Sequence, residues 1–288
     1  MQLDPERGYD LIGDIHGCGH ALARLLDQLG YRLQGGVWRH PRRQVIFLGD
    51  IIDRGPHIRE ALHLVHAMVD HGQAHCIMGN HEFNALGWYM PAPPGSGRDF
   101  VREHSPRFAR LLQETFQQFE HYPEEWKAFR EWFYDLPLFL ETERFRVVHA
   151  CWDSRVIARL RPLLNDGRIN PAILREAGLP GTFICQALDR LLRGTDMPLP
   201  EGMTLTSEEG FVRTFFRTKF WEENPQTYGD VVFQPDGLPE HAARLPLSPQ
   251  QKNRLFLYGP DEPLLFVGHY WRRGRPGPIR DNLACLDY

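Results

Sequence analysis

The chain has 288 residues, of which 42% are hydrophobic, and its 33 Lys and Arg against 37 Asp and Glu give a net charge of −4. This composition excludes a disordered or fibrous chain, and the length suffices to bury a core without disulfide bonds. The mildly acidic balance gives no reason to expect a surface that binds nucleic acid.

The five cysteines are widely spaced and form no Cys-x-x-Cys pair, so the sequence predicts neither a zinc knuckle nor a disulfide framework. This usage favours a reducing compartment. The first residues lack the pattern of a signal peptide, and no apolar stretch approaches the roughly 18 residues that a membrane span needs. We therefore expect a cytoplasmic protein with no membrane partner.

Short apolar runs that end in polar residues predict strands at 9–12, 45–48, 75–78, 145–148 and 264–267. Between the first three runs, the stretches 21–29 and 59–69 place apolar residues at the spacing of one helix face. Strands that alternate with helices pair in parallel, and ligands bind at the carboxyl ends of such strands. The polar residues that follow the runs are therefore the candidate site.

We expect a single domain over residues 1–288, enlarged by insertions at about 91–135 and 154–262. The first insertion starts at the breaker-rich PAPPGSG and becomes helical and aromatic, so it either covers the core or caps the substrate site. The second mixes helical pieces with Pro-rich loops, and the i, i+4 spacing of Arg213 and Arg217 predicts a helix there. A last strand is expected over 283–288.

Five motifs follow the five strands: GDIHG at 13–17, GDIIDRG at 49–55, GNHE at 79–82, VVHA at 147–150 and FVGHYW at 266–271. They supply carboxylate, amide oxygen and imidazole, which are the ligands that a pair of divalent ions requires. Asp14 and His16 are two residues apart and project to the same side of an extended stretch. Asp50 has two oxygens and can bridge two ions. Asn80, His149 and His269 complete the candidate ligands.

These motifs, in this order, resemble the calcineurin-like metallophosphoesterase superfamily. Arg54 in DRG and Glu82 in GNHE make the chain most similar to the branch of the phosphoprotein phosphatases and diadenosine tetraphosphatases. The resemblance implies a four-layered α/β/β/α sandwich with helical insertions. It also implies two divalent metal ions, for which imidazole and carboxylate suit manganese, iron or zinc.

Residue roles follow from the same resemblance. Asp14, His16 and Asp50 would bind the first ion, and the second would be bound by Asp50, Asn80, His149 and His269. His81 would protonate the leaving oxygen, and Asp53 would orient it, although Asp53 could instead cap the following helix. Arg54 would hold the phosphoryl oxygens while a hydroxide that bridges the metals attacks the phosphorus. Glu82 is expected to hold its turn together.

The last motif departs from the pattern of many relatives, because Trp271 stands where a second histidine would join the first metal. This departure disfavours nuclease-like activity. Substrate contacts are expected at Arg54, Asn80 and Trp271, while Trp152 and Tyr270 either line the pocket or pack in the core.

The expected function is hydrolysis of a phosphate ester or anhydride. The substrate is then a small phosphorylated molecule, a dinucleoside polyphosphate or another nucleotide, or a serine/threonine phosphoprotein. The alternatives are a non-catalytic metal-binding scaffold and a phosphodiesterase that acts on nucleotides. A scaffold would be expected to lose a ligand or the acid, and every one of these residues is present.

Overall fold

The computed structural model describes residues 3–4, 6–206, 212–233 and 238–288. Its first sheet joins β1 (Gly8–Ile12), β4 (Arg43–Phe47) and β5 (Ala74–Cys76), all parallel and in the order β1-β4-β5. Helices α1 (Gly19–Gln28) and α2 (Ile58–Asp70) connect these strands and pack on each other. The β-α-β-α-β order expected from the sequence is confirmed. A hairpin of β2 (Arg32–Gln34) and β3 (Val37–Arg39) precedes β4.

The second sheet has the order β14-β13-β7-β6, built from β14 (Leu283–Cys285), β13 (Leu264–Val267), β7 (Phe145–Val148) and β6 (Phe139–Glu141). Only the β6–β7 pair in it is antiparallel. The last strand was predicted to continue to residue 288, but β14 stops at Cys285, and Asp287 lies beyond it.

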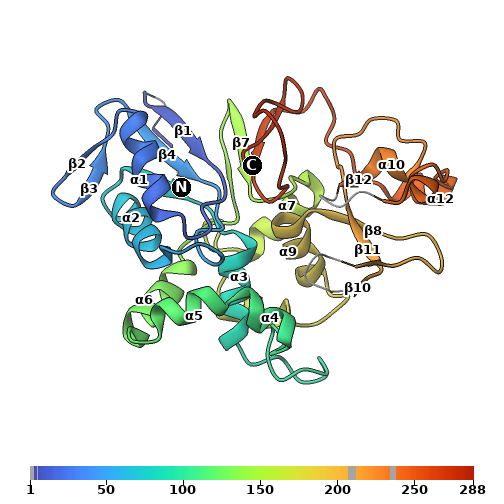
Figure 1. Ribbon diagram of the computed structural model, residues 1–288, viewed down its shortest axis with the longest axis horizontal. Coiled ribbons are helices and arrows are strands. Elements are labelled where there is room, and N and C mark those ends of the chain that lie inside the picture. Colours follow the sequence, from blue (N-terminus) through green and yellow to red (C-terminus); the bar gives the residue numbers. More distant parts are fainter. Residues whose placement is uncertain (1–2, 5, 207–211, 234–237) are drawn as a thin grey trace.

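The two sheets pack face to face, as the alternation of side chains along each strand shows. In β4, Ile46 belongs to an apolar cluster that also holds Val147 of β7, whereas Phe47 belongs to the cluster shared with the helices. Successive side chains of a strand point to opposite faces. Helices α1 and α2 therefore cover one outer face, and α7 (Ser154–Leu160) and α9 (Phe183–Arg193) cover the other (Figure 1). This is the four-layered α/β/β/α arrangement.

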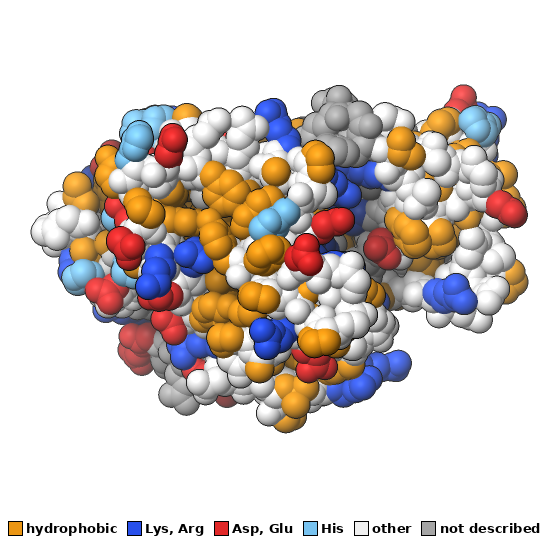
Figure 2. All heavy atoms as spheres, turned by 90° about the horizontal axis from the view of Figure 1, so that it is seen from below, with side chains coloured by type: hydrophobic (Ala, Val, Ile, Leu, Met, Phe, Trp, Pro, Cys, Tyr) orange, Lys and Arg blue, Asp and Glu red, His pale blue; other side chains and the backbone are white. Residues whose placement is uncertain are grey.

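The first insertion is helical, as expected. Helix α3 (Asn80–Tyr89) leads into it, and α4 (Pro106–Leu111), α5 (Gln113–Phe119) and α6 (Pro123–Phe133) follow (Figure 1). The aromatic side chains of Phe119, Trp126 and Phe133 are buried in the main core. The segment thus covers the core, which was one of the two expected roles. Seen from the side of these helices, acidic and basic side chains are interspersed (Figure 2).

The second insertion continues from α7 through the short helix η1 (Arg161–Leu163), α8 (Pro171–Glu176) and α9. It then adds β8 (Thr195–Pro198), β9 (Leu205–Thr206), β10 (Val212–Arg213), β11 (Phe215–Thr218), α10 (Tyr228–Val231), β12 (Val232–Phe233), α11 (Glu240–Ala243) and α12 (Pro249–Arg254). Residues 207–211 and 234–237 of this insertion lie outside the described part. Strands β8, β11 and β12 form an antiparallel sheet over an apolar cluster of their own, centred on Phe216 and Tyr228.

The helix predicted for Arg213 and Arg217 is wrong, because these residues lie on β10 and β11. The run VRTFFRT is rich in β-branched and aromatic residues, which favour a pleated surface. Phe216 and Thr218 are buried while Phe215 is exposed, the period of two that a strand requires. Among the described helices, none has the length and apolar character to span a bilayer.

Candidate metal centre

The loops after the strands meet at one edge because the first three strands end level with each other. Ile12 pairs with Phe47, and Phe47 pairs with Cys76. The GDIHG loop is hydrogen-bonded to the next loop, since the His16 and Gly17 amides donate to the carbonyls of Asp50 and Ile51 at 2.8 and 2.7 Å. In the second sheet, Gly268 N donates to His149 O at 2.9 Å. These bonds join the GDIHG loop to the GDIIDRG loop and the VVHA motif to the FVGHYW motif.

The backbone of these loops is strained at the residues that carry the functional groups. Positive φ angles occur at His16 (42°), Asp50 (50°), Asp53 (70°), Arg54 (66°) and His269 (60°). Asp166 is the one further non-glycine residue of this kind in the described part of the chain. Such angles are costly outside glycine and concentrate at functional sites. The rest of the fold thus stabilises a strained backbone at the edge where the motifs meet.

The Asp50 carboxylate lies at the centre of the assembled groups. Its Oδ2 atom is 3.7 Å from His16 Nε2, 3.7 Å from His81 Nε2 and 3.4 Å from His149 Nε2. Two groups of possible metal-ligand atoms share it: His16, Asp50 and His81 in one, and Asp50, His149 and His269 in the other. Asp50 therefore occupies the position expected of a ligand common to two ions.

The remaining candidate ligands lie around this carboxylate. Asp14 Oδ2 is 3.8 Å from His16 Nε2, and both Asp14 oxygens accept from His269 N at 3.2 Å. One amide atom of Asn80 lies 3.0 Å from His149 Nε2 and 2.6 Å from His269 Nδ1. The structure thus brings all six sequence-predicted ligands together.

Each ligand histidine that has a defined outer partner bonds to a backbone carbonyl through Nδ1. His16 Nδ1 is 3.0 Å from Ile52 O, and His149 Nδ1 is 2.7 Å from Leu48 O. These carbonyls fix a proton on Nδ1 and turn Nε2, the nitrogen that a metal ion would bind, toward Asp50. Within the described residues His269 Nε2 is buried and has no hydrogen-bond partner.

The pKa values show that the charges of these side chains are not balanced unless a cation is bound. Burial lowers the pKa of His16 to about 3 and that of His269 well below its usual range, so both rings are neutral. Burial opposes charge on His149 too, but the Asp50 carboxylate raises the pKa of His149 to about 10. Burial likewise raises the pKa of Asp14. Protons occupy places that divalent ions would fill, so the residues present fit a dinuclear metal centre.

His81 differs from the ligand histidines because its outer partner is a carboxylate. His81 Nδ1 lies 2.6 Å from Asp53 Oδ2, and both side chains are buried. Burial works against a charged ring, but Asp50 and Asp53 raise the pKa of His81. Asp53 does not cap α2, whose first turn is preceded by His57 without a side-chain cap. The Asp53 carboxylate faces the imidazole instead.

Glu82 holds the loop that carries Asp50. Its carboxylate accepts from the amides of Asp50 and Ile51, each at 2.8 Å, and from Gly79 N at 3.0 Å. The approach is so close that a Cβ on Gly79 would lie 2.2 Å from Asp50 Oδ1, which excludes any other residue there. Glu82 thus takes the structural position expected of it.

The three predicted substrate residues are placed differently. Asn80 is buried within the ligand set, and Arg54 is exposed beside it with its charge acting on His16 and His81. Trp271 is 49% exposed, and its ring lies under the guanidinium of Arg273 at 5.4 Å. Trp152 and Tyr270, for which packing and pocket roles were both open, are fully buried and pack in the core.

Three further residues lie at this edge: Thr115 and Asp287 were not found from the sequence, and Arg217 was singled out there only with Arg213, as a surface residue or a second phosphate clamp on a helix. Thr115 of α5 donates its hydroxyl to Asp53 Oδ1 and accepts from Asp53 N at 3.1 Å. Arg217 donates to His269 O at 2.8 Å. Asp287 is 9% exposed and is hydrogen-bonded to the Asp14 carboxyl. Asp287 follows an apolar strand, as Asp14 does, so the strand-end rule that identified the other motifs could have found it.

Residues 9–176 match the family described as calcineurin-like phosphoesterase, and the chain belongs to this family. The match confirms the resemblance and the fold expected from the five motifs. It also makes the chain a member of a family of metal-dependent phosphohydrolases.

Within that family, the chain is similar to proteins named bis(5'-nucleosyl)-tetraphosphatase PrpE [asymmetrical]. It is 32% identical to the protein of Oceanobacillus iheyensis over 142 residues, which cover 49% of this chain and 54% of the relative. It is 46% identical to the protein of Halalkalibacterium halodurans over 83 residues, or 28% of this chain and 33% of the relative. The chain thus spans about half or less of the length of these relatives.

Solved structures match at lower similarity. A serine/threonine phosphatase from Saccharomyces cerevisiae, described as similar to human phosphatase PP5, has a TM-score of 0.47 and 15% identity over 94% of this chain and 63% of that chain. A putative diadenosine tetraphosphatase has a TM-score of 0.44 and 14% identity over 99% and 84% of the respective chains. The family assignment depends on the match over residues 9–176 and not on these similarities.

Proposed function

We propose that the protein is a dinuclear metal-dependent phosphohydrolase that cleaves a phosphate ester or anhydride. The observation that carries this proposal is the position of Asp50 Oδ2, which is 3.7 Å from His16 Nε2 of the first proposed ligand set and 3.4 Å from His149 Nε2 of the second. A single carboxylate shared by two groups of ligand atoms is the arrangement that two adjacent metal ions require.

The first ion would be held by Asp14, His16 and Asp50. The second would be held by Asp50, Asn80, His149 and His269. When bound, the ions would stabilise charge on the phosphoryl oxygens and lower the pKa of water, the source of the nucleophile. Imidazole and carboxylate together suit manganese, iron or zinc, and we take manganese as the first ion to test.

The outer partners of the histidines separate the acid from the ligands. A backbone carbonyl accepts from Nδ1 of His16 and His149, which leaves Nε2 as a lone-pair donor. The Asp53 carboxylate stabilises a charged His81 ring, so His81 can carry a second proton on Nε2. We propose that His81 gives this proton to the leaving oxygen and that Asp53 orients the ring.

Arg54 is the proposed phosphoryl clamp. It is exposed next to the buried ligands, and its guanidinium can donate to two phosphoryl oxygens at once. Two divalent ions exceed the charge of Asp14 and Asp50 by about two units, or by about one if Asp287 is counted. The loaded site is therefore positive, as an anionic substrate requires.

The proposed substrates are a dinucleoside polyphosphate or a serine/threonine phosphoprotein. The similarity to proteins named tetraphosphatases, over about half of the chain, supports the first. We further propose that residues 1–288 act as one catalytic domain with insertions at about 91–135 and 154–262, since one apolar cluster includes residues of both sheets and both insertions. The unpaired state of all five cysteines supports a cytoplasmic location.

Hydrolysis of p-nitrophenyl phosphate with and without manganese tests the proposal. The wild-type protein should require the metal, and Asp50→Asn should be inactive. His81→Asn should retain its metals and lose roughly 10²–10⁴-fold in rate, the usual contribution of a general acid. Activity that persists without metal, or that is the same in both variants as in the wild type, would contradict the proposal.

A further inference from the structure

Three arginines outside the metal centre gather around one turn of α9. Burial raises the pKa of the Cys185 thiol, and the positive charges of Arg102, Arg193 and Arg98 all oppose this shift. All three guanidinium groups therefore lie near the same segment of α9. Arg98, Arg102 and Arg193 are called the arginine cluster below.

The cluster has more positive charge than its neighbours compensate. Arg193 pairs with Asp189, whose side chain is half exposed. Arg102 has no carboxylate within ion-pair distance among residues 3–4, 6–206, 212–233 and 238–288, and its Nε is buried without a hydrogen-bond partner. Burial and the nearby charge of Arg193 lower the pKa of Arg102 well below its usual range. Arg102 is half-buried, and the Asp189 charge that acts on it is already paired with Arg193, so the cluster favours an anionic ligand.

The cluster is also held rigidly. The Arg102 guanidinium lies 5.1 Å from the centroid of the Phe83 ring and 5.7 Å from that of Phe108. The Arg193 guanidinium lies 5.8 Å from the same Phe83 ring. Cations held over aromatic faces keep their position at little further cost in entropy. The donors are thus in place before a ligand arrives.

Helix α3 connects the cluster to the metal centre. Asn80, Asn84 and Gly87 are spaced i, i+4 and i+7 and share one face of the helix. Arg193 Nη2 donates to Asn84 Oδ1 at 2.7 Å, and the Arg102 side chain packs on Gly87, whose added Cβ would lie 2.7 Å from Arg102 Cγ. A helix rises 1.5 Å per residue, so Arg193 contacts α3 about 6 Å along the helix from Asn80, and Arg102 contacts it about 10 Å from Asn80.

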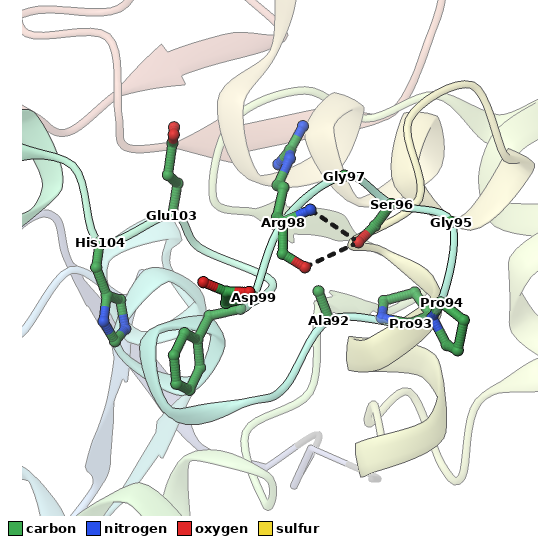
Figure 3. A pocket seen from close by; sticks show the side chains of 11 residues that line it. Ala92, Pro93, Pro94, Gly95, Ser96, Gly97, Arg98, Asp99, Glu103 and His104 are labelled. Atoms are coloured by element: carbon green, nitrogen blue, oxygen red, sulfur yellow. Dashed lines mark hydrogen bonds between the residues drawn. The ribbon is translucent and has the colours of Figure 1, made fainter.

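Arg98 lies in the loop between α3 and α4, and its charge acts on Arg102. It lines a hollow of about 460 Å³ formed by residues 92–100 with Glu103 and His104. Figure 3 shows Arg98 and Glu103 projecting from the same side of this loop. Glu103 and Asp99 make no ion pair with the cluster in the described structure, so Asp189 remains its one paired carboxylate.

We infer that the arginine cluster binds the phosphate groups of a polyphosphate substrate that lie beyond the group cleaved at the metal centre. This inference rests on the proposed phosphohydrolase function. Cations at successive intervals along a rigid helix match a ligand with negative charges at successive intervals. The guanidinium fork matches phosphoryl oxygens, and each such contact is charge-assisted.

The test compares two ligands that cannot be hydrolysed, at a fixed concentration of free manganese. Methylphosphonate reaches only the metal centre, whereas the methylene-bridged analogue of tripolyphosphate also reaches the cluster. Calorimetric titration gives both dissociation constants for the wild type, for Arg98→Ala, for Arg102→Met and for the control Arg24→Ala. Arg98 and Arg24 are both exposed, so neither substitution threatens folding.

Arg98→Ala and Arg102→Met should each weaken binding of the triphosphate analogue about tenfold, the effect of one lost charge-assisted contact. The affinity for methylphosphonate should change less than about twofold, and Arg24→Ala should change neither. Equal losses for both ligands, or no loss for the analogue, would overturn the inference. So would loss of binding to an acidic phosphopeptide with unchanged binding of the analogue, which would assign the cluster to a protein substrate.

The binding readout is independent of turnover. If the wild type fails to hydrolyse p-nitrophenyl phosphate but the arginine substitutions still weaken binding of the analogue, the proposed function is wrong and the inferred anion site stands. If hydrolysis is observed and the substitutions leave binding of the analogue unchanged, the inference about the arginine cluster is wrong and the proposed function stands.

Discussion

Single atoms decide the chemistry of this site. Asp50 Oδ2 faces three imidazoles, and the roles we propose for them follow their outer partners: Nδ1 of His149 bonds to a backbone carbonyl, and Nδ1 of His81 to the Asp53 carboxylate. The six proposed ligands could be predicted because each lies in a motif that follows the end of a strand. Thr115 could not, because it is 62 positions from Asp53 and carries no motif. Only the packing of α5 brings its hydroxyl to the buried carboxylate.

Thr115 makes a prediction at this scale as a positioning residue. Thr115→Val removes the hydroxyl that bonds Asp53, so the His81 ring loses its fixed orientation. We expect kcat for p-nitrophenyl phosphate to fall about 10-fold or more, the usual cost of losing an outer partner, with KM nearly unchanged. Thr115→Ser keeps the hydroxyl and should restore most of the rate. A valine variant as active as wild type, or a serine variant as poor as valine, would exclude this role.

At the scale of elements, the expected strands and helices of the first sheet formed because periodicity and strand-end glycines agree there. Arg213 and Arg217 show where such reasoning fails, since i, i+4 spacing also arises by chance in a strand. The partner of β11 is β8, nearly twenty residues earlier, and no local signal reports that pairing. The bounds of the two insertions stay a prediction, and the contacts of these segments depend on tertiary packing.

The ion pair between Arg59 of α2 and Glu125 of α6 gives a prediction about stability at the scale of elements. Glu125 of α6 accepts from Arg59 Nε and Nη2 at 3.0 and 2.9 Å and also contacts His63 of α2. The hydrogen bond from Arg59 lowers the pKa of Glu125. A carboxyl with a lowered pKa stabilises the fold above the pKa of the unfolded chain, and this contribution is lost as pH falls through the folded value.

Glu125→Gln should therefore lower the free energy of unfolding by about 1 kcal/mol at pH 7. The difference from wild type should shrink as the pH falls below about 4 and through the lowered pKa of Glu125, because the wild-type carboxyl then becomes uncharged, as the glutamine is. Urea unfolding at several pH values measures it. Glu124→Gln, one residue earlier and exposed, is the matched control and should have little effect at any pH. A difference in the free energy of unfolding that stays constant or grows as the pH falls would contradict a stabilising ion pair between Arg59 and Glu125.

For the whole molecule, two sheets bring motifs from residues 13–17 and 266–271 to one edge. The net charge is −4, and the face shown in Figure 2 mixes side chains of both signs, while the described centre needs cations to balance Asp14, Asp50 and Asp287. Overall charge therefore says little about the ligand, and the local arrangement of a few side chains decides it. The central claim is that this arrangement holds two metal ions through one shared carboxylate.

The metal content of the purified protein tests that claim most directly. After equilibration with manganese and removal of free ions, elemental analysis should give about two ions per wild-type chain. Asp50→Asn should lose both sites or retain one weakly, whereas His81→Asn should still hold about two, because we propose His81 as the acid and not as a ligand. A wild type that holds a single ion, or an Asp50→Asn protein that binds as many as the wild type with unchanged affinity, would contradict the account.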